Sequence, residues 1–589
     1  MNPTPRVKSS RLTRFASLFL LLFSVGAGAQ LASAQTPDPG TPGPLAVTRE
    51  EYDYGNLAFT PSGFPSSVEL KASVHYPTGL AGGPYPVVVF LHGRHATCYR
   101  GTTATLRWPC RSTEQPIPSY QGYDYISQVL ASHGYIVVSV SANGINAYDN
   151  NVTDLGMQAR AELVQRHLNQ WNTFNTTGAA PFGTKFVGKV NLQRVGTMGH
   201  SRGGEGVVKH HVYNASLGSP YNVRAVFPLA PVDFNRPVIN NVALSVILPY
   251  CDGDVNDNQG AHFFDDARYN VASDTGAKHT IQVMGANHNY YNTIWTPGLF
   301  SAGTADDWGY TTGGSTDAHC GTGAGNKRLT AAQQRGTGLA YISAFMRAYV
   351  GGESQFLPHL TGASAPPASA QTTNLHVSYH APAAARRDVN RLLTATNLST
   401  NTLGGAATQT GLTPQDLCGG DSPQPQHCLP STQSTTRQPH TTPSARATTK
   451  RGLSQLRTGW SSLATYTNDL PLGSRDVSGF QSLTFRVAVN FADTRNAQSA
   501  AQNFTVILTD GAGNTSGAIV GNHSAALFYP PGSVGPVPKV VLNTVRIPVS
   551  AFSGLNLADI RSVQFRFDQN LTGALLVSDV AFASAPTVQ

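Results

Sequence analysis

The stretch at residues 195–206, VGTMGHSRGGEG, constrains the fold of this chain more than any other segment. It has the pattern of a strand, a sharp turn and the start of a helix, with Ser201 at the turn. The glycines at positions 199 and 203 allow the backbone to bend sharply around this serine. An ordinary glycine turn has the same pattern, so the neighbouring segments must decide which architecture it belongs to.

Apolar runs of strand length recur on both sides of this stretch. The run YPVVVFLHG is continuous rather than alternating, which predicts a strand buried on both faces of a mostly parallel sheet. Segments with helical spacing separate the runs, so strand and helix alternate as in a doubly wound α/β sheet. The predicted strands are 67–76, 85–93, 135–142, 194–199, 223–231, 244–250 and 278–284, and the predicted helices are 123–133, 157–171, 203–213 and 330–349.

The composition changes after residue 360, where Ala, Pro and Ser become frequent. Further along, short segments alternate apolar and polar residues between Gly, Asn and Asp turns, which predicts an all-β sandwich. These segments are 482–489, 504–508, 540–549 and 562–567. We therefore expect a linker at 35–50, an α/β domain at 51–360, a linker at 361–374, and a β-sandwich domain at 375–589 with a low-complexity insertion around 419–450.

The first 34 residues have the pattern of a signal peptide. Basic residues precede the apolar run 15–25, and the small residues at 32–34 offer a cleavage site, so we expect an extracellular or periplasmic protein. Cleavage would lower the formal net charge from +8 to +4, with 36 basic against 32 acidic residues. No basic run remains that would favour a nucleic-acid partner, and no later apolar stretch approaches the ~20 residues of a transmembrane segment.

The chain contains six cysteines, and an even number in an exported protein favours disulfides over free thiols. They group as neighbours in the sequence. The expected pairs are Cys98 with Cys110, Cys251 with Cys320, and Cys418 with Cys428.

Three polar residues follow predicted strands at the edge where parallel sheets collect their chemistry. They occur in the order Ser201, Asp254, His288. A serine hydroxyl needs a neighbouring base to act as a nucleophile, and a carboxylate on the imidazole fixes the tautomer of that base. We predict that Ser201 is the nucleophile, His288 the base and Asp254 the acid.

Alternatives stay open for the acid. Asp252 lies two residues before Asp254 in the same loop, and Asp233 follows the preceding strand. The loop DGDVNDN also looks like a calcium-binding loop, but Asp257 replaces its turn glycine and Phe263 stands in the position of its bidentate glutamate. We expect no metal and no organic cofactor.

The order Ser, Asp, His resembles that of the α/β-hydrolases, and the motif GHSRGG at 199–204 resembles the nucleophile motif of chlorophyllases and secreted bacterial polyester hydrolases. The resemblance covers about residues 50 to 355. It implies an oxyanion hole formed by the backbone N–H groups of Arg94, after the His-Gly pair that ends strand 85–93, and of Arg202. The chain departs from the simplest members by an insertion at 94–120. The Arg202 side chain could pair with Glu205 on the helix surface.

We predict an exported serine hydrolase that cleaves carboxylic esters through an acyl-enzyme, and its substrate could be polymeric or insoluble. The second domain resembles jelly-roll, galactose-binding-like modules, which implies either contact with a carbohydrate or another surface, or a structural role. Two alternatives are a serine peptidase or amidase of the same fold, and a noncatalytic surface-binding protein with a relic hydrolase domain. The second would predict a broken triad, whereas all three positions are filled. Residues 35–360 should fold without the second domain.

Overall fold

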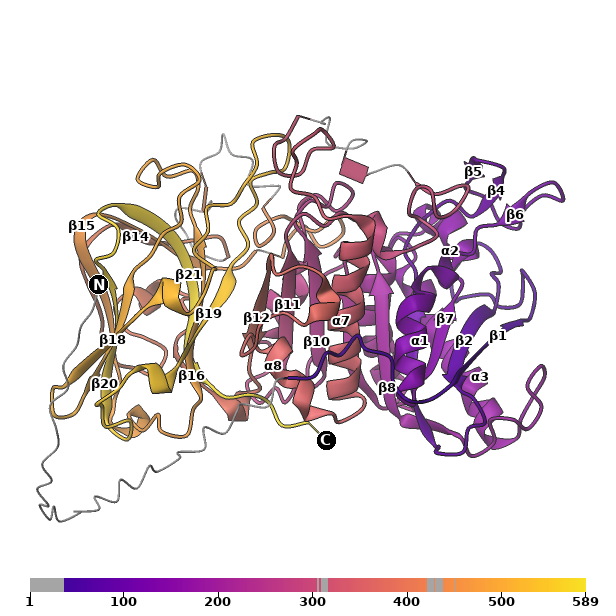
Figure 1. The fold of residues 1–589 in the computed structure, drawn as a ribbon, viewed down its shortest axis with the longest axis horizontal. Coiled ribbons are helices and arrows are strands. Elements are labelled where there is room, and N and C mark those ends of the chain that lie inside the picture. Colours follow the sequence, from indigo (N-terminus) through magenta and orange to yellow (C-terminus); the bar gives the residue numbers. More distant parts are fainter. Residues whose placement is uncertain are drawn as a thin grey trace, which may run out of the picture. The chain divides into compact units, whose positions relative to one another are not determined.

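A mixed nine-stranded sheet and an antiparallel sheet organise the chain in a computed structural model (Figure 1). The structure describes residues 36–304, 307–308, 316–420, 428–429, 438–450 and 452–588. The predicted signal peptide at 1–34 lies outside these residues, as does part of the predicted low-complexity insertion.

The first sheet has the strand order β1-β2-β7-β3-β8-β9-β10-β11-β12. Its six central strands, from β7 to β11 in this order, run parallel, and the outer pairs β1-β2, β2-β7 and β11-β12 are antiparallel. The strands are β1 (Val47–Asp53), β2 (Lys71–Pro77), β3 (Tyr85–Leu91), β7 (Ile136–Val140), β8 (Val190–His200), β9 (Val223–Leu229), β10 (Ala243–Pro249), β11 (Lys278–Val283) and β12 (Leu375–His380).

Helices cover both faces of this sheet. Successive side chains of a strand point to opposite faces, and in β3 Val87 and Val89 pack into one core while Val88 and Phe90 pack into the other. The first core includes side chains of α3 and α4, and the second includes those of α1 and α7. The predicted α/β-hydrolase architecture is therefore confirmed. The helices are α1 (Asp124–Ser132), α2 (Asn143–Tyr148), α3 (Met157–Thr176), α4 (Arg202–Ser216), α5 (Ala261–Ala267), α7 (Ala331–Tyr349) and α8 (Leu357–Leu360).

Strand β12 moves the end of the first sheet beyond the predicted boundary at residue 360. It pairs antiparallel with β11, with Val377 opposite Ile281. The residues of β12 fall in the predicted β-sandwich domain, and the sequence LHVSYH is short and partly polar, so its composition did not assign it to the first sheet. Its partner strand lies about a hundred residues earlier in the chain, and only the fold reveals that pairing.

The second sheet is antiparallel throughout, as expected of the all-β domain (Figure 1). Trp460 and Tyr466, the aromatic residues that could have offered a surface for stacking on a sugar, are each about 1% exposed and lie in its apolar core. The strands are β13 (Arg386–Asn390), β14 (Ala407–Cys418), β15 (Gln455–Asp469), β16 (Ser482–Val489), β17 (Thr505–Asp510), β18 (Thr515–Ile519), β19 (Asn543–Pro548), β20 (Ile560–Phe567) and β21 (Gly573–Ala583).

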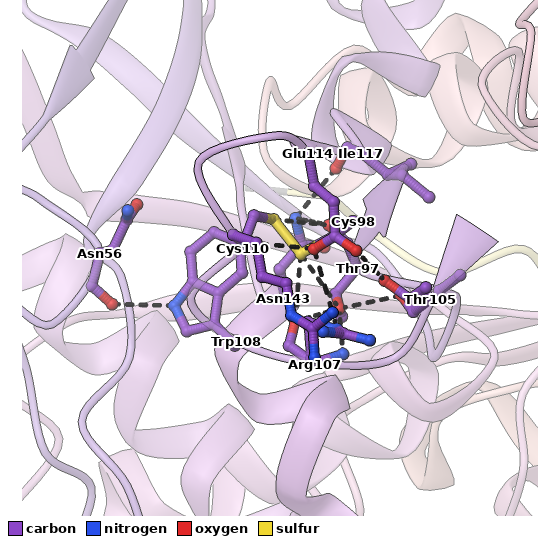
Figure 2. Close-up of a disulfide and its surroundings, with 12 residues drawn as sticks. Asn56, Thr97, Cys98, Thr105, Arg107, Trp108, Cys110, Glu114, Ile117 and Asn143 are labelled. Carbon is purple, nitrogen blue, oxygen red and sulfur yellow. Dashed lines mark hydrogen bonds and ion pairs between the residues drawn. A yellow bond between two sulfur atoms is a disulfide. The ribbon is translucent and has the colours of Figure 1, made fainter. Parts of the chain in front are cut away.

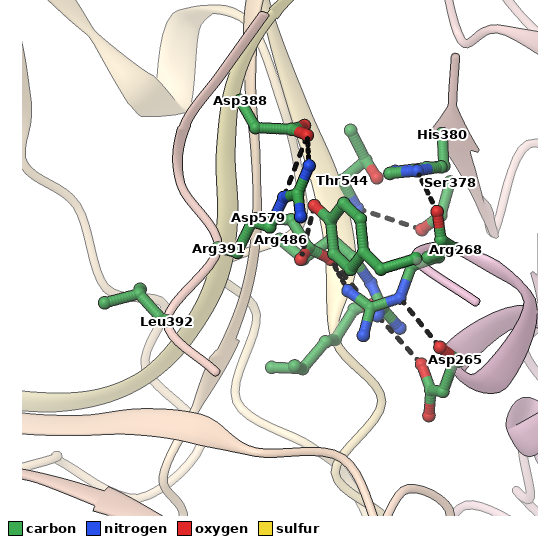
Figure 3. Close-up of polar contacts among 12 residues, drawn as sticks. Asp265, Arg268, Ser378, His380, Asp388, Arg391, Leu392, Arg486, Thr544 and Asp579 are labelled. Carbon is green, nitrogen blue, oxygen red and sulfur yellow. Dashed lines mark hydrogen bonds and ion pairs between the residues drawn. The ribbon is translucent and has the colours of Figure 1, made fainter. Parts of the chain in front are cut away.

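Buried charged side chains join the two sheets, and residues 36–589 form one compact unit (Figure 3). Asp265 in α5 accepts a hydrogen bond from Arg486 in β16 at 2.9 Å and lies 2.7 Å from Nδ1 of His440. Arg268 forms an ion pair with Asp579 in β21. These side chains are nearly inaccessible to solvent. A chain that ends at residue 360 would leave Asp265 and Arg268 without these partners, which argues against the expected independence of the first domain.

All three expected disulfides are present, namely Cys98–Cys110, Cys251–Cys320 and Cys418–Cys428. The first lies in the insertion, which forms a small sheet of β4 (Cys98–Arg100), β5 (Thr103–Thr105) and β6 (Gln115–Pro116). Figure 2 shows how neighbouring segments hold the insertion: Trp108 donates to the carbonyl of Asn56, and Asn143 in α2 donates to the carbonyl of Ile117. No helix among the described residues is both long and apolar enough to cross a membrane.

Candidate active site

Ser201 occupies the predicted turn between β8 and α4. Its φ of 58° and ψ of −124° are strained for a residue with a side chain and lift the serine above the sheet. A Cβ at Gly199 would lie 2.0 Å from the carbonyl oxygen of Gly203, so only glycine permits this approach of the two flanking backbones. Ser201 is 4% exposed.

His288 lies just after β11 and is paired with Asp252. Oδ2 of Asp252 is 2.9 Å from Nδ1 of His288, and Oδ1 accepts the backbone N–H groups of Asp254 and Val255 at 3.0 and 2.7 Å. The Asp252 side chain is completely buried. Because Nδ1–H donates to this carboxylate, Nε2 is the nitrogen of neutral His288 that can accept a proton.

Asp254, the acid predicted from the sequence, does not occupy that position. Its side chain is 60% exposed, and Oδ2 lies 3.7 Å from Nε2 of His288, on the opposite side of the ring from Asp252. Two acids two residues apart in one turn point in different directions, and the sequence does not show which one faces the imidazole. The other alternative, Asp233, is bound to His262, with Oδ2 3.1 Å from its Nδ1.

The charges around His288 favour its protonated form. Burial alone would lower the pKa of His288, but the carboxylates of Asp252, Asp254 and Asp307 raise the pKa to about 9. Asp307 also accepts the backbone N–H of Gly253 at 2.6 Å and thereby links His288 to the loop of residues 252–255, called the acid loop below because it holds the candidate acids.

His200, the residue before the serine, holds the backbone of His288 and was not predicted as part of the site. Its Nε2 lies 3.0 Å from the carbonyl oxygen of His288, and its Nδ1 lies 3.0 Å from the hydroxyl of Tyr123. Since a carbonyl can only accept, Nε2 carries the proton. Burial holds the pKa of His200 well below its usual range. Within the described part of the chain, no hydrogen bond joins Oγ of Ser201 to Nε2 of His288.

The loop after β3 brings Gly93, and with it the predicted oxyanion donor Arg94, next to the serine. A Cβ at Gly93 would lie 2.5 Å from Cβ of Ser201, so the two backbones are in contact. The carbonyl of Gly93 accepts from Nδ1 of His92 at 2.8 Å and from Nδ2 of Asn146 at 3.0 Å. Because a trans peptide places its N–H opposite its C=O, these two bonds orient the N–H of Arg94.

The protonation of His92 follows from its other partner. Nε2 of His92 accepts the backbone N–H of Ala142 at 2.9 Å, so Nδ1 carries the proton that it donates to Gly93. Burial lowers the pKa of His92 to about 3, so the ring is neutral. The N–H of Arg202 belongs to the first turn of α4, where helix geometry provides no acceptor. In the described segments, no hydrogen-bond acceptor takes the backbone N–H of Arg94 or that of Arg202.

Arg202 does not pair with Glu205 as expected. NH1 of Arg202 lies 2.9 Å from Asp149, while buried Glu205 accepts the backbone N–H groups of Phe234 and Asn235 at 2.7 and 2.9 Å. Burial and nearby Asp233 raise the pKa of Glu205 to about 8. Glu205 thus secures the loop after β9 through these backbone donors.

Lys539, which belongs to the second domain, contacts the acid loop at the backbone of Asp252. Nζ of Lys539 donates to the carbonyl of Asp252 at 3.2 Å, and its backbone N–H donates to the hydroxyl of Tyr250 at 3.1 Å. Burial lowers the pKa of Lys539 to about 8, although Asp252, Asp257 and Asp307 oppose that change.

The described residues bring one group of metal-ligand type together, Cys251, His319 and Cys320. Both cysteines belong to the same disulfide, so they offer no thiolate to a metal ion.

Comparison with known proteins shows that part of this domain is similar to one family. Residues 117–296 match the family model described as PETase: PET hydrolase-like. The match covers less than a third of the chain but includes Ser201, Asp252 and His288, and it supports a serine hydrolase that acts on esters. A search of curated proteins found no match to the chain.

Proposed function

We propose that the chain is an exported serine hydrolase of carboxylic esters, in which Ser201 is the nucleophile, His288 the base and Asp252 the acid. The single observation that carries the proposal is the strained Ser201 turn beside a buried His288–Asp252 pair. The backbone N–H groups of Arg94 and Arg202 are the proposed oxyanion donors. The three disulfides fit an extracellular protein.

The proposed mechanism follows from the protonation states. Neutral His288 takes the proton of Ser201 at Nε2 as Oγ bonds to the ester carbon, and the carbonyl π electrons move to the oxygen, where the two N–H groups stabilise the charge. Protonated His288 then gives its proton to the departing alcohol, leaving an acyl-enzyme that water hydrolyses by the same steps. The Ser201–His288 hydrogen bond is expected to form when substrate binds, as such bonds often tighten in the complex.

Replacing the nucleophile tests the proposal. Ser201→Ala should lose labelling by a fluorophosphonate and several orders of magnitude in turnover of a nitrophenyl ester, because no other group would carry the acyl chain. Ser216→Ala, at the exposed C-terminal end of α4, is the matched control and should keep both. A Ser201→Ala protein that retains labelling or turnover would contradict the assignment. A peptide anilide in the same assay separates an esterase from an amidase.

We further propose a supporting role for the second domain. The contact of Lys539 with the acid loop and the buried charges around Asp265 favour this role over sugar stacking, since Trp460 and Tyr466 are in the core. Carbohydrate binding by a galactose-binding-like module, and an insoluble polyester as the substrate, remain expectations. Both can be measured by binding of the inactive Ser201→Ala protein to polysaccharide and polyester particles.

A further inference from the structure

The two residues whose N–H groups form the proposed oxyanion hole also share a side-chain partner. Nε of Arg94 lies 3.1 Å from Oδ1 of Asp149, and NH1 of Arg202 lies 2.9 Å from its Oδ2. Arg94 comes from the loop after β3 and Arg202 from the start of α4. One carboxylate, at the end of α2, therefore ties together the two halves of the proposed hole.

The same carboxylate reaches the Gly93–Arg94 peptide by a second route. NH2 of Arg160 in α3 lies 2.8 Å from Oδ2 of Asp149 and donates to Oδ1 of Asn146 at 2.7 Å. Arg160 holds the amide oxygen of Asn146. The Nδ2 amide group of Asn146 therefore faces the other way and donates to the carbonyl of Gly93. That carbonyl belongs to the peptide whose N–H is the proposed Arg94 donor.

These contacts are shielded from water. The side chains of Asp149 and Arg160 are completely inaccessible and that of Arg202 is 15% exposed, so water competes little for their hydrogen bonds. Burial and the neighbouring arginines lower the pKa of Arg202 to about 10, which leaves the side chain protonated at neutral pH. A carboxylate that loses its charge here would leave three guanidinium groups facing one another.

We propose that Asp149 is a positioning residue of the oxyanion hole, which sets the separation and direction of the Arg94 and Arg202 N–H donors without touching the substrate. The proposal rests on the proposed serine-hydrolase function. An oxyanion hole works only when its donors are already placed for the tetrahedral intermediate, and two donors on separate segments need a common support.

The test compares an ester with its thionoester, in which sulfur replaces the carbonyl oxygen. Sulfur accepts hydrogen bonds weakly, so hydrolysis of the thionoester depends less on the donors. In Asp149→Asn full-length protein, kcat/KM for nitrophenyl acetate should fall about 10- to 100-fold, mainly through kcat, while the thionoester is affected much less. The oxoester-to-thionoester ratio should therefore fall. A purely structural role would lower both rates alike and leave the ratio unchanged.

A matched control and a second variant keep the test decisive. Asp265→Asn removes another buried carboxylate, which bonds Arg486 and His440 away from the serine, and should leave the ratio at the wild-type value. The double variant Arg94→Gln/Arg202→Gln cuts the same links and should lower the ratio even if Asp149→Asn does not fold. A wild-type ratio in every folded variant overturns the proposal. Ser201→Ala, run alongside, separates the two ideas, because its continued activity would instead refute the proposed function.

Discussion

At the scale of single residues, the acid loop offers a matched pair of substitutions. Asp252→Asn should reduce turnover about 10⁴-fold, because an amide on Nδ1 holds the imidazole in the wrong tautomer, while the fold stays intact. Asp254→Asn should be mild, since its exposed carboxylate lies on the Nε2 side at 3.7 Å. Turnover of a nitrophenyl ester measures both, with circular dichroism as the check on folding. The opposite ranking would return the acid role to Asp254.

The raised pKa of His288 predicts an alkaline activity profile. Only neutral imidazole accepts the serine proton, so kcat/KM should rise with pH and level off above about 9. Removing a carboxylate favours the neutral ring, so Asp254→Asn should shift the rising limb to lower pH by up to about one unit and increase activity near pH 7. The profile is measured with a nitrophenyl ester between pH 6 and 10. A limb that stays in place would show that Asp254 does not influence the base.

At the scale of elements, the central strands and long helices were predictable because they carry strong periodic patterns. The predicted strand 278–284 became β11, and the predicted helix 330–349 became α7 (Ala331–Tyr349). Elements held mainly by tertiary contacts were missed. Helix α2 has six residues, and β12 depends on a partner strand far away in the sequence. Their local sequences do not contain the information that stabilises them.

The same limit applies to the site. Ser201 and His288 could be placed because strand ends and a glycine motif identify them in the sequence, although their catalytic roles stay proposals. The choice between Asp252 and Asp254 depends on the direction of two side chains in one turn. Asp149 carries no motif, and only folding brings it to Arg94 and Arg202, so no sequence pattern could have singled it out.

At the scale of the whole molecule, the two sheets share buried charges that neither can satisfy alone. Asp265 contacts Arg486 and His440, and the pKa of Asp265 is held well below its usual range because its interactions with these two residues outweigh the effect of burial. A buried ion pair broken by removal of one partner typically costs about 3–5 kcal/mol. We therefore expect the first domain to depend on this interface for its stability, in contrast to two modules joined by a flexible linker.

This interface gives the last prediction. In the full chain, Arg486→Met should lower the free energy of unfolding by about 3–5 kcal/mol, measured by urea denaturation, because Asp265 keeps its charge but loses a cation. Arg457→Gln is the matched control: its ion pair with Asp416 lies in the second domain and is about a quarter exposed, so its loss should cost under about 1 kcal/mol. A chain ending at residue 381, which retains β12, should likewise be less stable and slower on a small soluble ester. Full stability and full small-ester activity in that shortened chain would instead support a tethered, independent second domain.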